Sequence, residues 1–315
     1  MNNQLNYRNF TEFLSEKHHE TKELMGPWLR SGEINMIFAA RGTGKTVFCY
    51  SLAHAMATGQ PFLRWNPPAA SKVFFIDAES SDTLMHKRFS RVEDGSEVSA
   101  LPENLKILTR TSSGFLPNLS TQEGQNIYYP LMMAADVTIV DNLLTIAPPL
   151  DTKDDDVKIW YRIKPFIYKL RNAGKTVLLI HHSAKSGVQY GTSIRENDMD
   201  NIIKLSNPTF SDNDMALPLY FEFEKGRDLA ADQREPLFIT YEVIGSKAQW
   251  TYQNGTEHRK KEIIRAAQTI KNKALIAAKV NCPTWLVYET LASEKAEEPI
   301  DNYFSERSFD EEPPF

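Results

Sequence analysis

The stretch FAARGTGKTVF, residues Phe38 to Phe48, ends like a phosphate-binding loop but begins differently. The loop pattern is G-x-x-x-x-G-K-[ST], and its first position is Ala39 instead of glycine. The apolar run before it, INMIFA (34–39), predicts a strand, and the sequence after it predicts an amphipathic helix over 45–58. A strand, a tight turn and a helix in this order place backbone N–H groups at a helix N-terminus, where phosphate binds.

The loop therefore predicts a site for ATP and Mg²⁺. Lys45 is expected to reach the β and γ phosphates, and the hydroxyl of Thr46 to bind the metal. Gly42 and Gly44 supply the permissive backbone where a phosphate comes nearest. The alternative is a glycine-rich turn at the start of a helix with a chance lysine. We expect the nucleotide-binding residues to be Arg41, Gly42, Thr43, Gly44, Lys45, Thr46 and Val47.

The composition suits a globular core, with 315 residues, of which 41% are hydrophobic and 24% charged. The two cysteines, Cys49 and Cys282, lie far apart and imply neither a disulfide framework nor a zinc site. No apolar run approaches the roughly 20 residues that span a bilayer, and the first ten residues lack a signal-peptide pattern. We therefore expect a cytoplasmic protein without a membrane partner.

The rest of the sequence predicts an α/β fold with a mostly parallel, twisted sheet. Between Glu33 and Tyr252, apolar runs rich in β-branched residues alternate with helical patterns, as in sheets covered on both faces. The predicted strands are 34–39, 72–78, 105–109, 137–142 and 176–181, followed by antiparallel additions at one edge, 219–224, 237–243 and 248–252. The predicted helices are 45–58, 81–92, 122–134 and 155–173.

Polar residues end several of these strands, at the edge where open α/β sheets bind ligands. Asp141 ends VTIVD and is a candidate metal-binding carboxylate; the alternative is an ordinary Asp-Asn turn. Alternation points Asp77 and Glu79 to one side, and we favour Glu79 as a general base because it lies just past its strand. A helix N-cap is the alternative for this segment. His181 and His182 end a fourth strand, where adjacent side chains face opposite ways, which argues against a metal pair.

Taken together, these residues resemble the RecA-fold hexameric ATPases, specifically the RepA-like helicase family of plasmids and phages. The matching segments are PWLRSGEINMIFAARGTGKT, FFIDAES, VTIVDNLLT, LRNAGKTVLLIHHSAKSGVQYGTSIREND and FEFEKGRDL. They cover roughly residues 27 to 255, and members of this family often have a residue other than glycine at the Ala39 position.

The resemblance implies roles for individual residues. Lys45 and Thr46 would bind phosphate and Mg²⁺, Asp141 would hold the metal, and Glu79 would be the catalytic base. His182 would be a sensor of the γ-phosphate. Lys225 and Arg227 would reach the ATP of a neighbouring subunit as trans-acting fingers; without the resemblance, EKGRD would be interpreted as a solvated strand end and turn.

One position departs from the family. The family pattern Q-R-G-[ST] is QYGT here, so Tyr190 replaces an arginine. Either Arg195 compensates or a contact to nucleic acid or to another subunit is lost. The segment 183–193, which carries Lys185 and Tyr190, is our expected contact with DNA.

Residues 256–293 fit a helix-turn-helix, with ALIAAKV as the first helix, NCP as the turn and TWLVYETL as the candidate recognition helix. Seven Lys and Arg residues between Glu257 and Lys279, Arg259 among them, would supply phosphate contacts. The candidate recognition helix has no Arg or Lys, and a three-helix bundle that serves packing or oligomerisation is the alternative.

The last segment, 294–315, carries eight acidic and two basic residues and is typical of a disordered, solvated tail. Its tip, Asp310 to Phe315, resembles that of bacterial single-stranded DNA-binding protein (SSB), whose terminal Phe would enter an apolar pocket of a host partner.

The sequence thus predicts four parts: an N-terminal helical segment (1–26), a RecA-like ATPase domain (27–255), the helical module (256–293) and the acidic tail (294–315). The expected function is a ring-forming, Mg-ATP-dependent ATPase of a mobile element. It would act on DNA, most directly single-stranded DNA, as a homo-hexamer with helicase or translocase activity. The alternatives are a loader or remodeller without unwinding activity, and an ATP-switched DNA-binding regulator.

Overall fold

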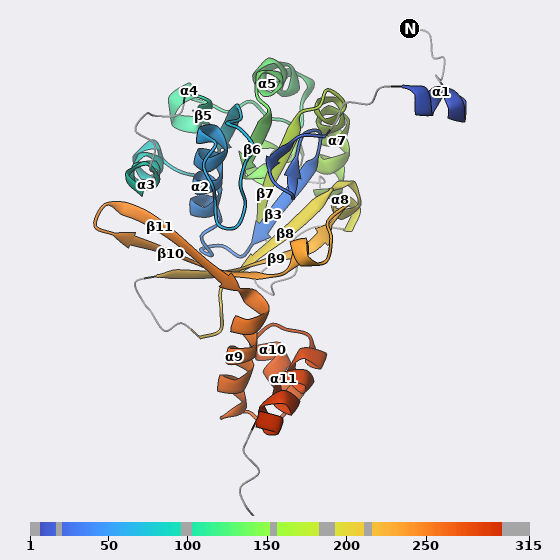
Figure 1. The fold of residues 1–315 in the computed structure, drawn as a ribbon. Helices are drawn as coiled ribbons and strands as arrows, with labels where there is room; N and C mark the ends of the chain where they lie inside the picture. Colours follow the sequence, from blue (N-terminus) through green and yellow to red (C-terminus); the bar gives the residue numbers. More distant parts are fainter. Residues whose placement is uncertain are drawn as a thin grey trace, which may run out of the picture.

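The computed structural model describes residues 7–16, 21–95, 103–151, 156–182, 193–210 and 216–297. Within these residues, the main sheet has nine strands in the order β11-β10-β9-β8-β3-β7-β6-β4-β5 (Figure 1). Its strands are β3 (Ile34–Ala39), β4 (Val73–Asp77), β5 (Leu105–Thr109), β6 (Val137–Asp141), β7 (Thr176–His182), β8 (Asn201–Ser206), β9 (Leu217–Gly226), β10 (Leu237–Ile244) and β11 (Lys247–Asn254). A small separate sheet pairs β1 (Glu23–Met25) with β2 (Leu29–Arg30).

The strands from β3 to β8 pair in parallel, while β9, β10 and β11 add an antiparallel edge. The α/β fold with a mostly parallel sheet is therefore confirmed, and so is the antiparallel addition at one edge. The helices are α1 (Phe10–Ser15), α2 (Lys45–Thr58), α3 (Asp82–Gly95), α4 (Arg110–Ser113), α5 (Gln122–Ala134), α6 (Leu143–Ile146), α7 (Asp156–Asn172), α8 (Ser193–Asp198), α9 (Gly255–Ala267), α10 (Lys273–Lys279) and α11 (Thr284–Glu297), with a short 3-10 helix η1 (Asp232–Arg234).

Two apolar cores lie on opposite faces of the sheet. Alternate residues of β3 belong to different cores: Ile37 packs with α2, whereas Met36 packs with α5 and α7. Because helices cover both faces, the central strands are buried throughout, and this explains their continuous apolar sequences. These central strands therefore expose little of their surface between their ends.

The expectation that helix 45–58 is amphipathic is wrong. Residues on nearly all sides of α2 are buried, because the helix lies between the sheet, α3 and the hairpin of β10 and β11. Trp250 of β11 donates from its indole N–H to Ser51 Oγ at 2.9 Å, and its ring lies 5.9 Å from that of Phe48. The helix after the glycine turn is thus fixed within the protein body.

Strand β8 was not among the predicted strands. It pairs in parallel with β3 and antiparallel with β9, so it joins the two parts of the sheet. Its sequence NIIKLS carries polar residues at Asn201, Lys204 and Ser206, which shorten the apolar run below a recognisable strand pattern.

The helices α9, α10 and α11 form a module with its own core, which lies below the sheet in Figure 1. The predicted helix-turn-helix corresponds to α10, a turn in which Asn281 has φ 50°, and α11. Trp285 and Tyr288 of α11 are exposed, at 63% and 55%.

Arg259 of α9 does not serve the predicted phosphate contacts. It is 4% exposed and donates to the carbonyls of Val280 and Asn281, both at 2.7 Å, and to Glu222 of β9 at 3.0 Å. Buried Glu262 accepts from the hydroxyl of Tyr220 of β9 at 2.7 Å. The module is therefore attached to β9 through buried polar contacts.

Some predictions lie outside the described residues. These are the expected DNA contact with Lys185 and Tyr190, and the tip from Asp310 to Phe315. Of the N-terminal segment 1–26, the described part holds α1, which stands away from the rest of the chain in Figure 1, and β1.

Candidate nucleotide site

The predicted phosphate-binding loop joins β3 to α2 and has the backbone that such a loop requires. Gly42 and Gly44 have φ 79° and 105°, values that side chains other than hydrogen rarely tolerate. A Cβ added to Gly44 would also lie 2.4 Å from Leu217 Cδ2. Ala39, in the position of the missing first glycine, is 1% exposed and packs in the core with α2. Ala39 is not among the residues that line the cleft, so the substitution leaves the phosphate site open.

A cleft of about 860 Å³ opens in front of this loop. It lies at the carboxyl ends of β3, β4, β5 and β7, which agrees with the expectation for a parallel sheet. Its lining residues are Arg41, Gly42, Gly44, Lys45, Thr46, Val47, Ala78, Glu79, Ser80, Ser81, Arg88, Arg110, Thr111, Thr145 and His182. The structure thus brings most of the predicted nucleotide-binding residues together. Thr43 is turned away, and its hydroxyl donates to the carbonyl of Ala40 at 2.8 Å.

Lys45 is the cation at the base of the cleft. It is 4% exposed, and its ammonium donates to the carbonyls of Ala39 and Ala40 at 3.2 and 3.0 Å. Burial lowers the pKa of Lys45, while the carboxylates of Asp141 and Glu79 oppose that shift. A phosphate would provide a stronger, charged acceptor than the two neutral carbonyls that the ammonium now contacts.

Asp141 ends β6 and is 1% exposed, and the side chain of Thr46 lies close enough to oppose the rise of its pKa. Burial raises the pKa of Asp141 to about 6, and Asp77 adds to the shift. Among the described residues, its buried Oδ1 has no hydrogen-bond partner. A buried carboxylate oxygen beside a hydroxyl is the hard oxygen chemistry that Mg²⁺ prefers, so Thr46 and Asp141 fit a magnesium ion.

Glu79 faces the cleft, and its partners lie at the ends of two other strands, β6 and β7. Its carboxylate contacts His182 Nε2 at 3.2 Å, accepts from the amide of Asn142, and lies 3.4 Å from the hydroxyl of Thr145. The hydrogen bond with His182 lowers the pKa of Glu79, and burial partly opposes it. Glu79 is therefore held as an ionised, partly exposed carboxylate, the form in which it can accept a proton from water.

Asp77 has a different role from that of Glu79, although the sequence points both to one side. Asp77 is fully buried, accepts from the Tyr50 hydroxyl, and accepts from the backbone N–H groups of Glu79 and Ser80 at 2.8 and 2.7 Å. It fixes the turn that carries Glu79 and does not line the cleft.

The two adjacent histidines face opposite ways, as expected for neighbours on a strand. His182 lines the cleft, whereas His181 is fully buried and lies 3.3 Å from the guanidinium of Arg195. Arg195 also pairs with Asp156 at 2.9 Å and is 2% exposed. The suggestion that Arg195 compensates for the family arginine at a nucleic-acid contact is therefore wrong, because its side chain is buried inside the subunit.

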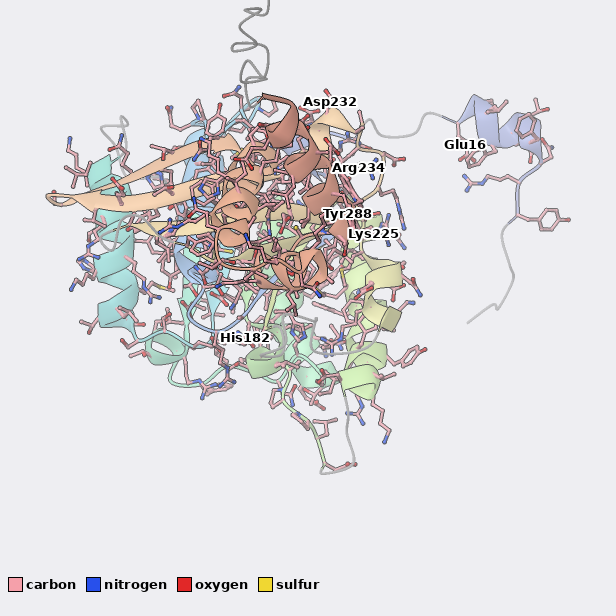
Figure 2. The ribbon with its side chains drawn as sticks, turned by 90° about the horizontal axis from the view of Figure 1, so that it is seen from below. Glu16, His182, Lys225, Asp232, Arg234 and Tyr288 are labelled. Atoms are coloured by element: carbon pink, nitrogen blue, oxygen red, sulfur yellow. The ribbon has the colours of Figure 1, made fainter. Side chains whose placement is uncertain are left out.

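Lys225 and Arg227 lie at the opposite end of the parallel strands from the cleft, where β8 and β3 begin. Gly226 pairs with Asn201, and Asn201 pairs with Asn35 at the start of β3. Since β3 rises about 3.3 Å per residue, the four steps from Asn35 to Ala39 separate these cations from their own phosphate loop by roughly 13 Å along the strand. Figure 2 accordingly shows Lys225 and His182 well apart. They do not belong to the cleft of their own chain.

Several residues of the site were missed from the sequence, among them two that contact Glu79 and two arginines. Asn142 and Thr145 hold Glu79, while Arg88 and Arg110 line the cleft. Arg110 carried a usable signal, because it follows directly on β5 at the edge where the other site residues lie. Arg88 lies within α3, and nothing in its local sequence indicates that this helix turns it toward the loop.

Within the described ranges, no group of three or more His, Cys, Asp or Glu side chains is arranged to hold a metal ion. Magnesium bound by one carboxylate and one hydroxyl does not need such a group. None of the helices described is both long and apolar enough to cross a membrane.

Comparisons with known proteins agree with this geometry. The flagellar accessory protein FlaH from Methanocaldococcus jannaschii matches 72% of this chain and 92% of its own, with 13% identity and a TM-score of 0.51. A KaiC-like protein from Pyrococcus horikoshii matches 72% of this chain and 93% of its own, with 17% identity and a TM-score of 0.47. A search of curated protein sequences found no match.

The fold is thus RecA-like, an α/β fold built on a large, mostly parallel sheet. A family model described as an AAA domain matches residues 2–188, more than half of the chain and all of the site from Arg41 to His182. The chain belongs to the AAA domain family.

Proposed function

We propose that this protein is a Mg-ATP-dependent, ring-forming ATPase that acts on DNA as a RepA-like helicase or translocase of a plasmid or phage. The observation that carries the proposal is the pair of Glu79 and His182, 3.2 Å apart, across the cleft from Lys45. A base and a sensor in contact over a phosphate site suit an enzyme that cleaves the γ-phosphate and responds to its loss.

Each side chain of the site has a separate role in the proposed reaction. Lys45 and the loop N–H groups bind the phosphates, and Glu79 accepts a proton from the attacking water while Asn142 and Thr145 hold its carboxylate in place. His182 donates to Glu79 or to the γ-phosphate, so the two contacts compete. Magnesium, held by Thr46 and Asp141, would neutralise charge on the phosphate oxygens.

The position of Lys225 and Arg227 supports a ring. These cations lie roughly 13 Å from their own loop along β3, so they can contribute to ATP cleavage only in another subunit. A cation supplied by a neighbour stabilises transition-state charge and makes hydrolysis depend on assembly. A hexamer is the expected ring.

Two alternatives involve the same site. A loader or remodeller would hydrolyse ATP without unwinding DNA. A regulator would use ATP as a switch and read duplex DNA with α11; the exposed face of α11 carries Trp285, Tyr288 and Glu289 in place of Arg or Lys, which disfavours this alternative.

A strand-displacement assay with wild type and Lys45→Ala tests the proposal. The wild type should displace a strand and hydrolyse ATP faster with single-stranded DNA, and K45A should lose both activities, about 100-fold or more. Lys106→Ala, an exposed lysine on β5 outside the cleft, is the matched control. Native mass measurements with a non-hydrolysable ATP analogue should show a hexamer.

Three outcomes separate the candidates. Hydrolysis without strand displacement would favour the loader, and sequence-specific footprints on duplex DNA that persist in K45A would favour the regulator. Absence of ATP binding in the presence of magnesium would contradict all three.

A further inference from the structure

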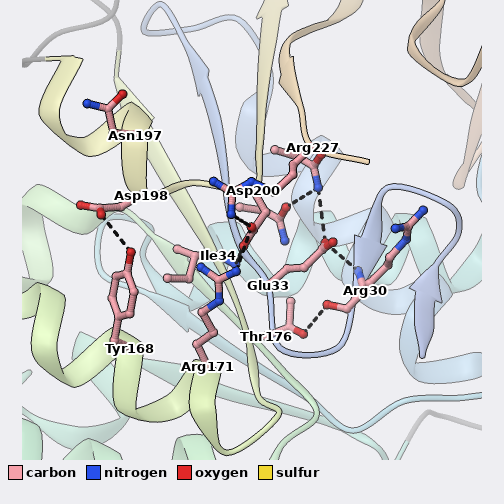
Figure 3. A network of polar contacts seen from close by, with 12 residues as sticks. Arg30, Glu33, Ile34, Tyr168, Arg171, Thr176, Asn197, Asp198, Asp200 and Arg227 are labelled. Atoms are coloured by element: carbon pink, nitrogen blue, oxygen red, sulfur yellow. Dashed lines mark hydrogen bonds and ion pairs between the residues drawn. The ribbon is translucent and has the colours of Figure 1, made fainter. Parts of the chain in front are cut away.

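The two finger cations are held in place by a short segment of their own subunit, residues 196–200, which includes the end of α8. The ammonium of Lys225 donates to the carbonyls of Glu196 and Asn197 at 2.6 and 3.4 Å. The guanidinium of Arg227 donates to Asp200 Oδ1 at 2.8 Å (Figure 3). Both cations are therefore held by residues 196–200. This segment follows β7, the strand that ends in the proposed sensor His182.

Asp200 is the centre of this arrangement. It is 2% exposed, and its carboxylate accepts from the backbone N–H of Ile34 at 2.9 Å and from Arg171 at 3.0 Å, in addition to Arg227. A second pair of bonds joins the backbones, from Asp200 N to Ile34 O at 2.7 Å and from Arg227 N to Asp200 O at 2.9 Å. Arg227 is thus tied by backbone and side chain to a residue that is itself tied to the first residue of β3.

The contact leaves Arg227 able to act. It uses the NH1 group of the guanidinium, and 43% of the side chain remains exposed. A guanidinium has five N–H donors in a rigid fork, so fixing one of them orients the others without using them. Ordering the side chain in advance also lowers the entropy cost of placing it beside a phosphate.

We propose that Asp200 is a positioning residue that holds Arg227 for the ATP of the neighbouring subunit. The proposal rests on the trans-acting role given to Arg227 under the proposed function. Since Asp200 is bonded to the start of β3, and β3 ends at the phosphate loop, one rigid strand joins the loop of a subunit to the cation that it presents to the next subunit. The two neighbouring ATP sites are thereby mechanically linked.

Asp200→Asn tests the proposal in the full-length assembled protein. Because the amide no longer attracts the guanidinium as an anion, kcat for ATP should fall by about tenfold or more, a part of what loss of a trans-acting arginine costs. The KM for ATP and the Kd of a fluorescent ATP analogue should stay within about twofold of wild type, since Asp200 lies far from the bound nucleotide of its own subunit.

A matched control separates positioning from simple destabilisation. Glu262→Gln also neutralises a buried carboxylate with several donors, but it lies in the helical module and contacts neither finger. It should lower thermal stability as D200N does and leave kcat unchanged. If D200N fails to fold, Asp200→Glu keeps the charge and displaces the carboxylate by one methylene, and it should show the same loss in kcat at unchanged KM.

A double variant gives the decisive comparison. D200N combined with Arg227→Ala should be no slower than R227A alone, because both changes remove one interaction. Full kcat in D200N or D200E while R227A is slow would overturn the positioning role and leave the proposed function standing. Full kcat in R227A itself would overturn the trans-acting role and this inference with it.

Discussion

At the scale of single residues, the site depends on how Glu79 is held. Three side chains from the ends of β6 and β7 and from α6 surround its carboxylate, while Asp77 fixes the turn below it. The carboxylate lines the cleft with 41% of its side chain exposed. Such preorganisation is what the proposed role of Glu79 as a catalytic base requires.

We therefore predict that Glu79→Gln separates binding from cleavage. Gln keeps the size and the hydrogen bonds of the side chain but cannot accept the proton, so kcat should fall by about 100-fold or more while ATP still binds. Turnover and nucleotide fluorescence measure the two properties. Glu123→Gln, an exposed carboxylate on α5, should change neither, and substantial turnover in E79Q would assign the base to another residue.

The second prediction concerns Glu33, close to Asp200. Burial raises the pKa of Glu33 to about 7, and the nearby Asp200 adds to the shift. Between the unfolded pKa of about 4.5 and the folded pKa of about 7, the native state retains a proton that the unfolded chain has lost, so stability falls as pH rises through this window.

Glu33→Gln should remove that fall, because Gln does not titrate. Denaturation at pH 5 and pH 8 should show a difference in unfolding free energy that is smaller in E33Q than in wild type, by on the order of 2 kcal/mol. An equal difference in the two proteins would place the titration on another group.

Sequence alone predicted the site residues whose chemical type forms a motif. It missed the residues that belong to the site only because the fold brings them there. The loop motif and the strand-end carboxylates predicted Lys45, Asp141 and Glu79; the fold places Lys45 and Glu79 on the cleft and buries Asp141 close to Thr46. Asn142 and Thr145 are ordinary residues in sequence, and their contact with Glu79 arises only when β4 and β6 lie side by side. Such contacts between distant segments have no local pattern to reveal them.

At the scale of elements, most strands and helices were predictable from their own sequences. Which elements pack against each other was not. The strand 105–109 and the helices 45–58 and 122–134 have the bounds expected from sequence, since length and composition were unambiguous. β8 was missed because its polar positions interrupt the apolar run, and α2 was misjudged as amphipathic because a hairpin 200 residues later covers its outer face.

The docking of the helical module also belongs to this scale. Arg259→Ala would leave Glu222 and two carbonyls without their buried donor, so the free energy that holds α9 to β9 should fall by about 3 kcal/mol. Hydrogen exchange should show faster opening of α9, α10 and α11 with little change in β3 or β7. Lys260→Ala, whose side chain pairs with Glu257 at the surface, is the control; equal protection in both variants would contradict the account.

At the scale of the whole molecule, the sequence indicated the fold class, while the relation between the ATP cleft and the finger cations emerged only from the sheet order. Lys225 and Arg227 are far along the chain from the loop, and only the position of β8 between β3 and β9 places them at the opposite end of the parallel strands from the cleft. The resemblance to a known family implied a role for these two cations. The sequence did not indicate where in the fold they lie.

The acidic tail gives a prediction at the same scale. If the segment Asp310 to Phe315 acts as an SSB-like tip, deletion of Pro314 and Phe315 should remove binding to host proteins that recognise such tips, because the apolar anchor is lost. A titration with such a partner measures the affinity. Tyr303→Ala, an aromatic change outside the tip, should bind as wild type does, and unchanged affinity after the deletion would refute the tip.

The attachment of the helical module to β9 has a consequence for assembly. Arg259 donates a hydrogen bond to Glu222, which lies only three residues before Lys225 on the same strand. This stretch of β9 pairs with β8, while the pairing of β9 with β10 ends at Phe221. Under the proposed trans-acting role of Lys225, the strand that anchors the helical module also carries a cation for the next subunit, so one element would serve both docking and assembly.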